Sequence, residues 1–213
     1  QARTHYAEGN YVRATDAYTR LLRKDPTSIL HRRNRAWSYM ALGRFSKAAS
    51  DFELATGEIG LGVPLLALVQ GDLKDATTGL KKAAPTWFFA NLFLSILEPE
   101  WDHVGTPKNS WERSLAEFAK GELSELDLVT LAGRGSGKDR LRRLCEANTY
   151  AALRHDLAGE RELAIPLYEA AVNTGIGDYI EMAVALNRLR RLESGGRCLG
   201  PAEAAEVAPE APA

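Results

Sequence analysis

The sequence predicts an all-α solenoid of helical hairpins, with about twelve helices and an irregular break in the middle. Three observations lead to this fold class. Small and aromatic residues recur 34 positions apart near the start of the chain. Amphipathic segments of helical period then follow one another to about residue 193. No run alternates apolar and polar residues between turn signals, as a strand would.

The first two units are the most regular part of the pattern. Their glycines are expected to form the turn inside each hairpin, and their alanines to let the paired helices approach closely. Pro26 is expected to end the first unit's second helix. The alternative is a generic amphipathic bundle with coincidental spacing. The matched positions are Gly9 with Gly43, Tyr11 with Phe45, Ala14 with Ala48, Tyr18 with Phe52, and Leu21 with Ala55.

A shortened third unit follows at an offset of 28 residues. Its first helix is predicted at 61–70, with Pro64 in the first turn, and an apolar helix at 86–97 follows Pro85. Residues 1–97 are therefore predicted to form an N-terminal set of repeat units. The residues that repeat the second unit's pattern are Gly71, Leu73, Ala76, Leu80 and Ala83.

The period breaks over residues 98–139. Prolines and glycines predict an irregular connection at 98–109, and helices are expected at 110–120 and 124–132, the second started by Ser124 and Asp127. The glycine-rich stretch 133–139 superficially resembles a phosphate-binding loop. It lacks the required first glycine and the Ser or Thr after Lys138, so we interpret it as a flexible linker without a cofactor.

A last unit is predicted over 140–193, because Gly159, Ala164 and Tyr168 restore the internal spacing. The helix at 179–192 is expected to seal the end of the solenoid, with its arginines, at positions 188, 190 and 191, in water. Residues 194–213, rich in Pro, Ala and Glu towards the end, are expected to form a flexible tail.

Composition excludes several classes of protein. The 213 residues carry 27 basic and 28 acidic side chains, a net charge of −1 that gives no general attraction to nucleic acid. Two cysteines make neither a disulfide framework nor a zinc motif. The longest apolar stretch, 87–97, is too short to span a membrane. Because the chain begins at Gln1, within a repeat, we expect a processed or trimmed product.

The first two units resemble tetratricopeptide repeats, which are helix–turn–helix units of 34 residues. The second half resembles bacterial tetratricopeptide lipoproteins of the new-lipoprotein-I type. This resemblance implies a periplasmic protein that recruits partners, among them a processing protease. The segments that carry it are 111–118, Gly121, Ser124, Glu125, Leu128, 143–150, 171–175 and 178–181.

A basic cluster opens the second unit and suggests a binding groove. In tetratricopeptide proteins the first helices line a concave face, and some members clamp a terminal carboxylate. Arginine suits this role because its guanidinium binds a carboxylate with two hydrogen bonds. The alternative is that Arg32 and Arg35 only solvate the helix or pair with acidic neighbours. The predicted groove residues are Arg3, Tyr6, Arg33, Asn34 and Trp37.

Aromatic residues outside this groove offer a second candidate surface. Trp87, Phe88, Phe89 and Phe93 could form an exposed patch for a partner, but Phe89 and Phe93 have helical spacing, which favours a place in the core. Trp101, in the irregular segment, is a candidate surface residue for a partner. Cys145 is interpreted as a small buried side chain.

We therefore expect a non-enzymatic adaptor or scaffold that binds a protein or peptide, either acidic or with a free carboxylate. The alternative is a permanent structural subunit or assembly factor of a larger complex. An enzyme is a remote alternative, since the four histidines are scattered and no acid, base or nucleophile set is apparent. No catalytic, cofactor or metal residues are predicted.

Overall fold

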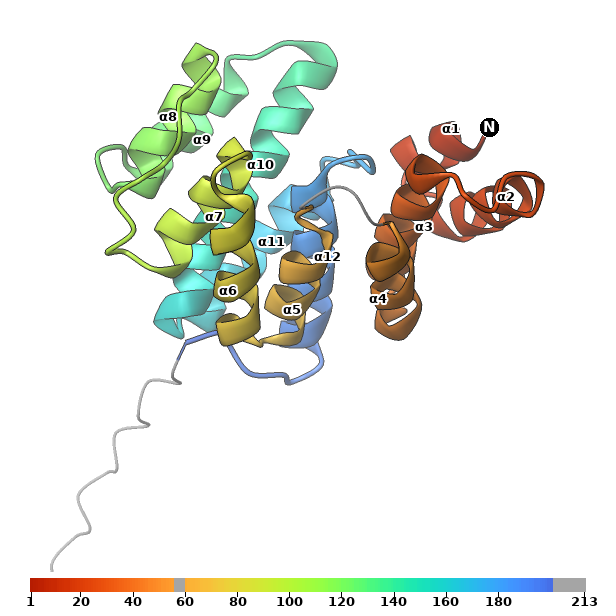
Figure 1. The fold of residues 1–213 in the computed structure, drawn as a ribbon. Helices are drawn as coiled ribbons and strands as arrows, with labels where there is room; N and C mark the ends of the chain where they lie inside the picture. The colour runs from red at the N-terminus through yellow and green to blue at the C-terminus, as the bar shows by residue number, and fades with distance from the viewer. Residues whose placement is uncertain (56–59, 201–213) are drawn as a thin grey trace, which may run out of the picture.

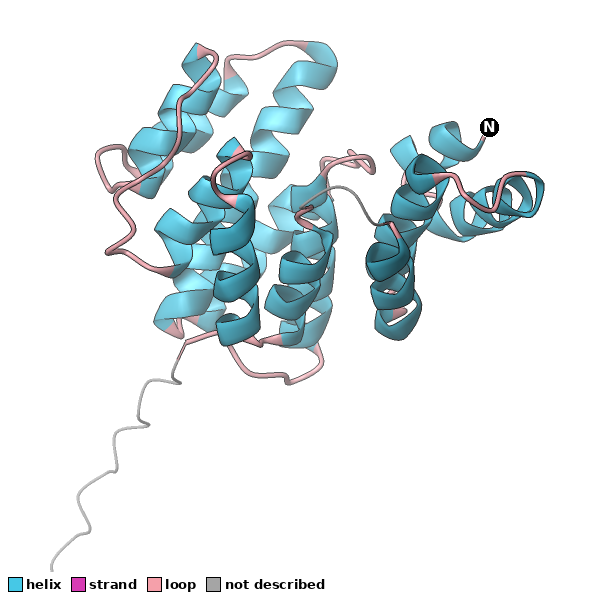
Figure 2. Ribbon diagram, viewed as in Figure 1, coloured by secondary structure: helices cyan, strands magenta, loops and turns pink. Residues whose placement is uncertain are grey.

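The computed structural model describes residues 1–55 and 60–200. Within them it shows twelve α-helices and no strand, so the predicted all-α class and helix number are confirmed (Figures 1 and 2). The predicted tail beyond residue 200 lies outside the described residues. The helices are α1 (Ala2–Ala7), α2 (Tyr11–Lys24), α3 (Ile29–Ala41), α4 (Phe45–Leu54), α5 (Gly62–Gln70), α6 (Leu73–Ala83), α7 (Phe88–Leu97), α8 (Ser110–Ala119), α9 (Glu125–Gly133), α10 (Gly137–Ala158), α11 (Arg161–Val172) and α12 (Ile180–Glu193).

Consecutive helices pack as hairpins, as the repeat pattern predicts. Gly9 and Gly43, in the turns of the first two hairpins, have φ of +70° and +69°, a conformation that other residues rarely adopt. The small residue after each turn is fully buried, which allows the helices to approach closely. These equivalent positions are Ala14, Ala48, Ala76 and Ala164.

The central break is only partly irregular. Residues 98–109 contain no helix, as predicted, and Asn109 and Ser124 cap α8 and α9 by accepting hydrogen bonds from backbone N–H groups. The predicted linker at 133–139 is shorter than expected, because α9 extends to Gly133 and α10 begins at Gly137, so that residues 134–136 alone connect the two helices. No helix in the two described stretches is long and apolar enough to cross a membrane.

The last helix corrects a second expectation. Instead of sealing an end, α12 packs against α3, α5, α10 and α11. Arg188 is fully buried and pairs with Asp156, whose carboxylate accepts from the arginine Nε at 2.8 Å. Its predicted exposure was wrong because α12 has neighbours on two sides. Arg190 and Arg191 are exposed, as predicted.

Contacts far apart in sequence join the two ends of the chain. The hydroxyl of Tyr11 donates to the carbonyl oxygen of Gly177 at 3.2 Å, and the Gly177 N–H donates to that of Ala7 at 3.3 Å. Asn187 Nδ2 donates to the Met40 carbonyl at 2.9 Å. In Figure 1, α1–α4 form a lobe to one side of the other helices. The lobe is thus held against the turn before α12 and against α12 itself.

One polar bridge connects three helices and gives a pH-dependent prediction. His155 of α10 lies 2.9 Å from Glu125 of α9 through Nε2 and 2.5 Å from Glu160, the residue before α11, through Nδ1. Partial burial lowers the pKa of His155, but the hydrogen bonds with Glu160 and Glu125 outweigh it and leave the pKa raised.

Because folding raises this pKa, the bridge stabilises fully below about pH 6.5 and is lost as the pH rises through the folded value. We expect His155→Gln to destabilise the protein at about pH 6 and to have little effect at about pH 9. Urea unfolding at both pH values measures this, with His103→Gln, an exposed histidine, as the control. Equal losses at both pH values would contradict the ionic contribution.

Candidate functional site

A cavity of about 430 Å³ lies where the N-terminal lobe meets α5, α7, α10 and α12. Its lining combines aromatic rings with charged groups, although the helices that supply them are far apart in sequence. The aromatic residues are Tyr6, Trp37, Phe52, Trp87, Phe89 and Tyr179, and the charged residues are Arg33, Glu146, Asp178 and Glu181. Asn34, Ala55, Ile180 and residues 60–63 at the start of α5 complete the lining.

Four of the five predicted groove residues lie together at this cavity. Tyr6 comes from α1, and Arg33, Asn34 and Trp37 come from α3. Arg3 is exposed and is not among the lining residues. The role of these residues in binding a partner remains a prediction, and the structure shows that residues of α1 and α3 share one cavity lining.

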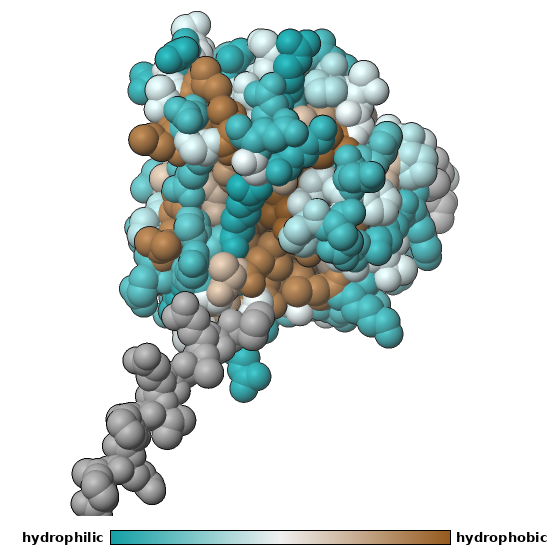
Figure 3. Space-filling view, turned by 90° about the vertical axis from the view of Figure 1, so that its left-hand side faces the viewer, coloured by the Kyte–Doolittle hydropathy of each residue, from teal (hydrophilic) through white to brown (hydrophobic). Residues whose placement is uncertain are grey.

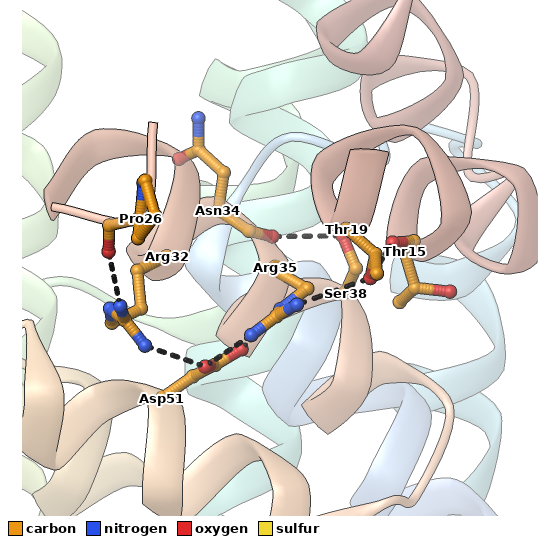
Figure 4. Close-up of polar contacts among 8 residues, drawn as sticks. All are labelled: Thr15, Thr19, Pro26, Arg32, Asn34, Arg35, Ser38 and Asp51. Atoms are coloured by element: carbon orange, nitrogen blue, oxygen red, sulfur yellow. Dashed lines mark hydrogen bonds and ion pairs between the residues drawn. The ribbon is translucent and has the colours of Figure 1, made fainter. Parts of the chain in front are cut away.

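Arg32 and Arg35 of α3 point toward Asp51 of α4 (Figure 4). Arg35 binds Asp51 of α4 with two hydrogen bonds, Nε to Oδ2 at 2.7 Å and Nη2 to Oδ1 at 2.8 Å. Arg32 lies 3.8 Å from the same carboxylate and donates to the Pro26 carbonyl. The interpretation that these two arginines pair with an acidic neighbour is confirmed. In Figure 4, the amide of Asn34 points away from Asp51.

The rings of the lining differ in how tightly they are held. Trp37 is 7% exposed and packs edge-on against Phe52, with ring centroids 5.0 Å apart. Trp87, at the start of α7, is 38% exposed. Phe93 is fully buried, as predicted, whereas Phe89 is only half-buried and lines the cavity. Core burial is therefore confirmed for Phe93 and partial for Phe89, which packs against the core, while Trp87 is exposed.

Two buried glutamates contribute the electrostatics of the cavity. Glu146 is 4% exposed and its Oε2 accepts from the indole N–H of Trp111 at 2.5 Å, while Glu181 is 1% exposed and its Oε1 accepts from the Tyr150 hydroxyl at 2.6 Å. Burial, and for Glu146 also the charge of Glu181, raises the pKa of Glu146 to about 8 and that of Glu181 to about 7. The buried Oδ1 of Asp178 has no hydrogen-bond partner within residues 1–55 and 60–200.

Sequence reasoning missed these acids. Glu146 gave no signal of burial, since Arg142 and Arg143 lie one helical turn earlier, as on an exposed face with ion pairs. Glu181 follows Ile180 at the start of α12 and gives no such signal, because acidic residues are common in a first helical turn. That both meet at one cavity follows only from the packing of α12 on α10.

Trp101 lies elsewhere. It is half-buried, and its indole N–H donates to the His103 carbonyl at 2.7 Å, with Asn91 Oδ1 also within 3.3 Å. The polar atom of the ring is thus used internally, and a role of Trp101 in binding a partner stays a prediction. Trp101 lines a second cavity with Ile96, Arg154 and other residues of α7, α8 and α10.

Figure 3 shows the side at the left of Figure 1, where a mostly hydrophilic surface surrounds a hollow with apolar side chains.

The environment of Cys145 disfavours reaction at its thiol. Cys145 is fully buried, as predicted, and burial raises the pKa of its thiol, so the reactive thiolate is disfavoured. Within residues 1–55 and 60–200, no three His, Cys, Asp or Glu side chains are grouped so that they could hold a metal ion.

Comparisons with known proteins give no family assignment. No protein-family model matches the chain, and no curated protein matches it. The structure shows an all-α array of helical hairpins, in which the cavity between α1, α3, α7, α10 and α12 gathers aromatic and charged side chains.

Proposed function

We propose that this chain is a non-enzymatic adaptor of the tetratricopeptide type, which binds a segment of a partner protein in the cavity between the N-terminal lobe and α7, α10 and α12. One observation carries the proposal. Residues 6, 33, 34 and 37, selected from the repeat pattern as groove residues, lie at the same cavity as four further aromatic rings and three carboxyl groups from other parts of the chain.

The composition of the cavity suits recognition of a peptide. Binding sites combine apolar walls with a few polar groups that fix orientation, and tryptophan, tyrosine and arginine contribute most to binding energy at interfaces. The surrounding hairpins keep these side chains in place before a ligand arrives, which lowers the entropic cost of binding. Trp87 supports this reading, since a large ring that is 38% exposed at a cavity can gain buried area on binding.

Trp87→Ala is expected to weaken binding of a peptide selected from a random library by about tenfold or more, because a central tryptophan contributes about 2 kcal/mol or more at such interfaces. Trp87 is preferable to Trp37 for this test, since Trp37 packs on Phe52 and its removal would also cost stability. Calorimetric titration measures the affinity. The control is Leu126→Ala, which truncates a side chain 77% exposed on α9.

Undiminished binding by Trp87→Ala would place the interaction outside this cavity.

Purification of the unmodified protein with its partner distinguishes an adaptor from a permanent subunit of a larger complex. An adaptor exchanges its partner reversibly and is stable alone, whereas a permanent subunit co-purifies with unchanged stoichiometry. Turnover that survives purification and disappears on a single substitution would favour an enzyme instead.

A further inference from the structure

We infer that the cavity recognises a basic peptide segment, by seating one Lys or Arg side chain between its aromatic rings and the carboxyl groups of Glu146, Asp178 and Glu181. This inference rests on the proposed function and names the chemistry of its ligand. A carboxylate ligand, which the basic cluster of the sequence suggested, would meet Arg33 but also three carboxyl groups. A cationic side chain would be repelled by Arg33 but attracted by the three carboxyl groups.

The carboxyl groups have unused capacity for a donor. Glu146 accepts the Trp111 indole N–H at Oε2, and a carboxylate can accept further hydrogen bonds. The glutamate is 4% exposed and lines the cavity. At the same cavity, the buried Oδ1 of Asp178 has no hydrogen-bond partner among the residues that the structure describes. A buried acceptor without a donor is costly, so an ammonium or guanidinium group would be stabilised beside Asp178.

The aromatic rings point to the same ligand independently of the acids. Ring faces attract cations, and this attraction grows when the cation leaves water. Tyr179 already has a cation over its ring, since the guanidinium carbon of Arg142 lies 5.5 Å from the ring centroid. Trp87 and Phe89 offer two further rings at the cavity. The long aliphatic part of Lys or Arg also suits apolar walls.

The charged groups around the glutamates come from several helices. The charges of Glu181 on α12, Asp139 on α10 and Glu112 on α8 all disfavour ionisation of Glu146, while the Trp111 N–H favours it. Glu181 is held by the Tyr150 hydroxyl and by its own backbone N–H. Arg33 and Asp178 complete the charged lining, and Arg142 lies over Tyr179.

This arrangement couples binding to proton release. Burial raises the pKa of Glu146 to about 8 and that of Glu181 to about 7, so both are largely neutral at about pH 6. A bound cation favours their ionised forms, and protons must leave. Binding is therefore expected to tighten by about tenfold or more between about pH 6 and pH 8.

The experiment uses libraries of acetylated peptides of about nine residues, with Lys, Arg, norleucine or Glu fixed at the centre, a span suited to a groove-bound extended segment. Acetylation removes the terminal amine as a source of charge. Preferential selection of the Lys and Arg libraries supports the inference. Selection of norleucine or Glu peptides that depend on Trp87 would overturn it while leaving the proposed function intact. No binding from any library would contradict both.

Variants then test the carboxyl groups with a selected basic peptide. Glu146→Gln and Glu181→Gln each keep an acceptor for Trp111 or Tyr150, so the fold should persist, as circular dichroism can verify. Each is expected to weaken binding by about tenfold at about pH 8 and to flatten the pH dependence. The control, Glu162→Gln, removes the same charge from an exposed position on α11. Equal effects from the control and cavity variants would overturn the inference.

Should an amide variant fail to fold, the unmodified protein provides a second measurement. Calorimetry at about pH 7 in two buffers of different ionisation enthalpy reports the protons released on binding. Net release is expected for the basic peptide, since the glutamates lose protons as the cation enters. Zero release, or uptake of protons, would overturn the inference.

Discussion

Asp156→Asn is expected to lower the free energy of unfolding by about 3–5 kcal/mol, since removing one partner of a buried ion pair leaves the other charge uncompensated. Asp156 and Arg188 are both fully buried, and their two hydrogen bonds measure 2.8 and 2.9 Å. The carboxylate also accepts from the Tyr168 hydroxyl and from the Leu199 N–H, both at 2.9 Å. This group therefore ties α10 to α11, α12 and the segment after α12.

The matched control is Asp139→Asn, which removes the same charge from an exposed pair. Asp139 lies 2.8 Å from Arg143 one helical turn away on α10, and both side chains are substantially exposed. Such pairs contribute about 0.3–0.5 kcal/mol. Urea unfolding followed by circular dichroism measures both variants. Equal losses would mean that the Asp156 pair contributes no more than a surface pair.

The hairpins could be predicted because their determinants are local. A glycine that turns with positive φ and an alanine at a close helix contact are fixed by the geometry of one unit. Ser124 likewise marks the start of α9 through a bond to the N–H three residues on. For the same reason the repeat pattern could predict that Tyr6, Arg33 and Trp37 lie on one surface, and all three line the same cavity.

The packing of α12 against α10 and α3 could not be predicted in this way. Arg188 is polar and belongs to a helix with exposed arginines, so the local pattern predicts that it is exposed too. Its burial depends on the ion pair with Asp156, 32 residues earlier. Glu181 becomes part of the cavity only because α12 packs between α10 and α3. Contacts at such separations are specified by tertiary packing and not by periodicity.

Gly177→Ala is expected to destabilise the junction between the two ends of the chain by about 1–3 kcal/mol, the usual cost of overpacking. A Cβ at this position would lie 2.4 Å from the Tyr6 carbonyl oxygen and 2.5 Å from the Gly9 nitrogen. These are backbone atoms, so they cannot yield by a side-chain rotation. The turn before α12 must therefore move away from α1, and its hydrogen bonds with Ala7 and Tyr11 should weaken.

Gly133→Ala is the matched control, because a Cβ there has nothing within 4 Å and the position ends α9. Hydrogen exchange should show faster exchange in α1 and α2 for Gly177→Ala but not for the control, since local opening follows the lost contacts. The same variant should weaken peptide binding, because Tyr6 lies on one side of the junction and Asp178 and Tyr179 on the other. If hydrogen exchange becomes faster in α1 and α2 while binding is unchanged, binding does not depend on the junction between Gly177 and α1. The ligand must then be held by α7, α10 and α12 alone.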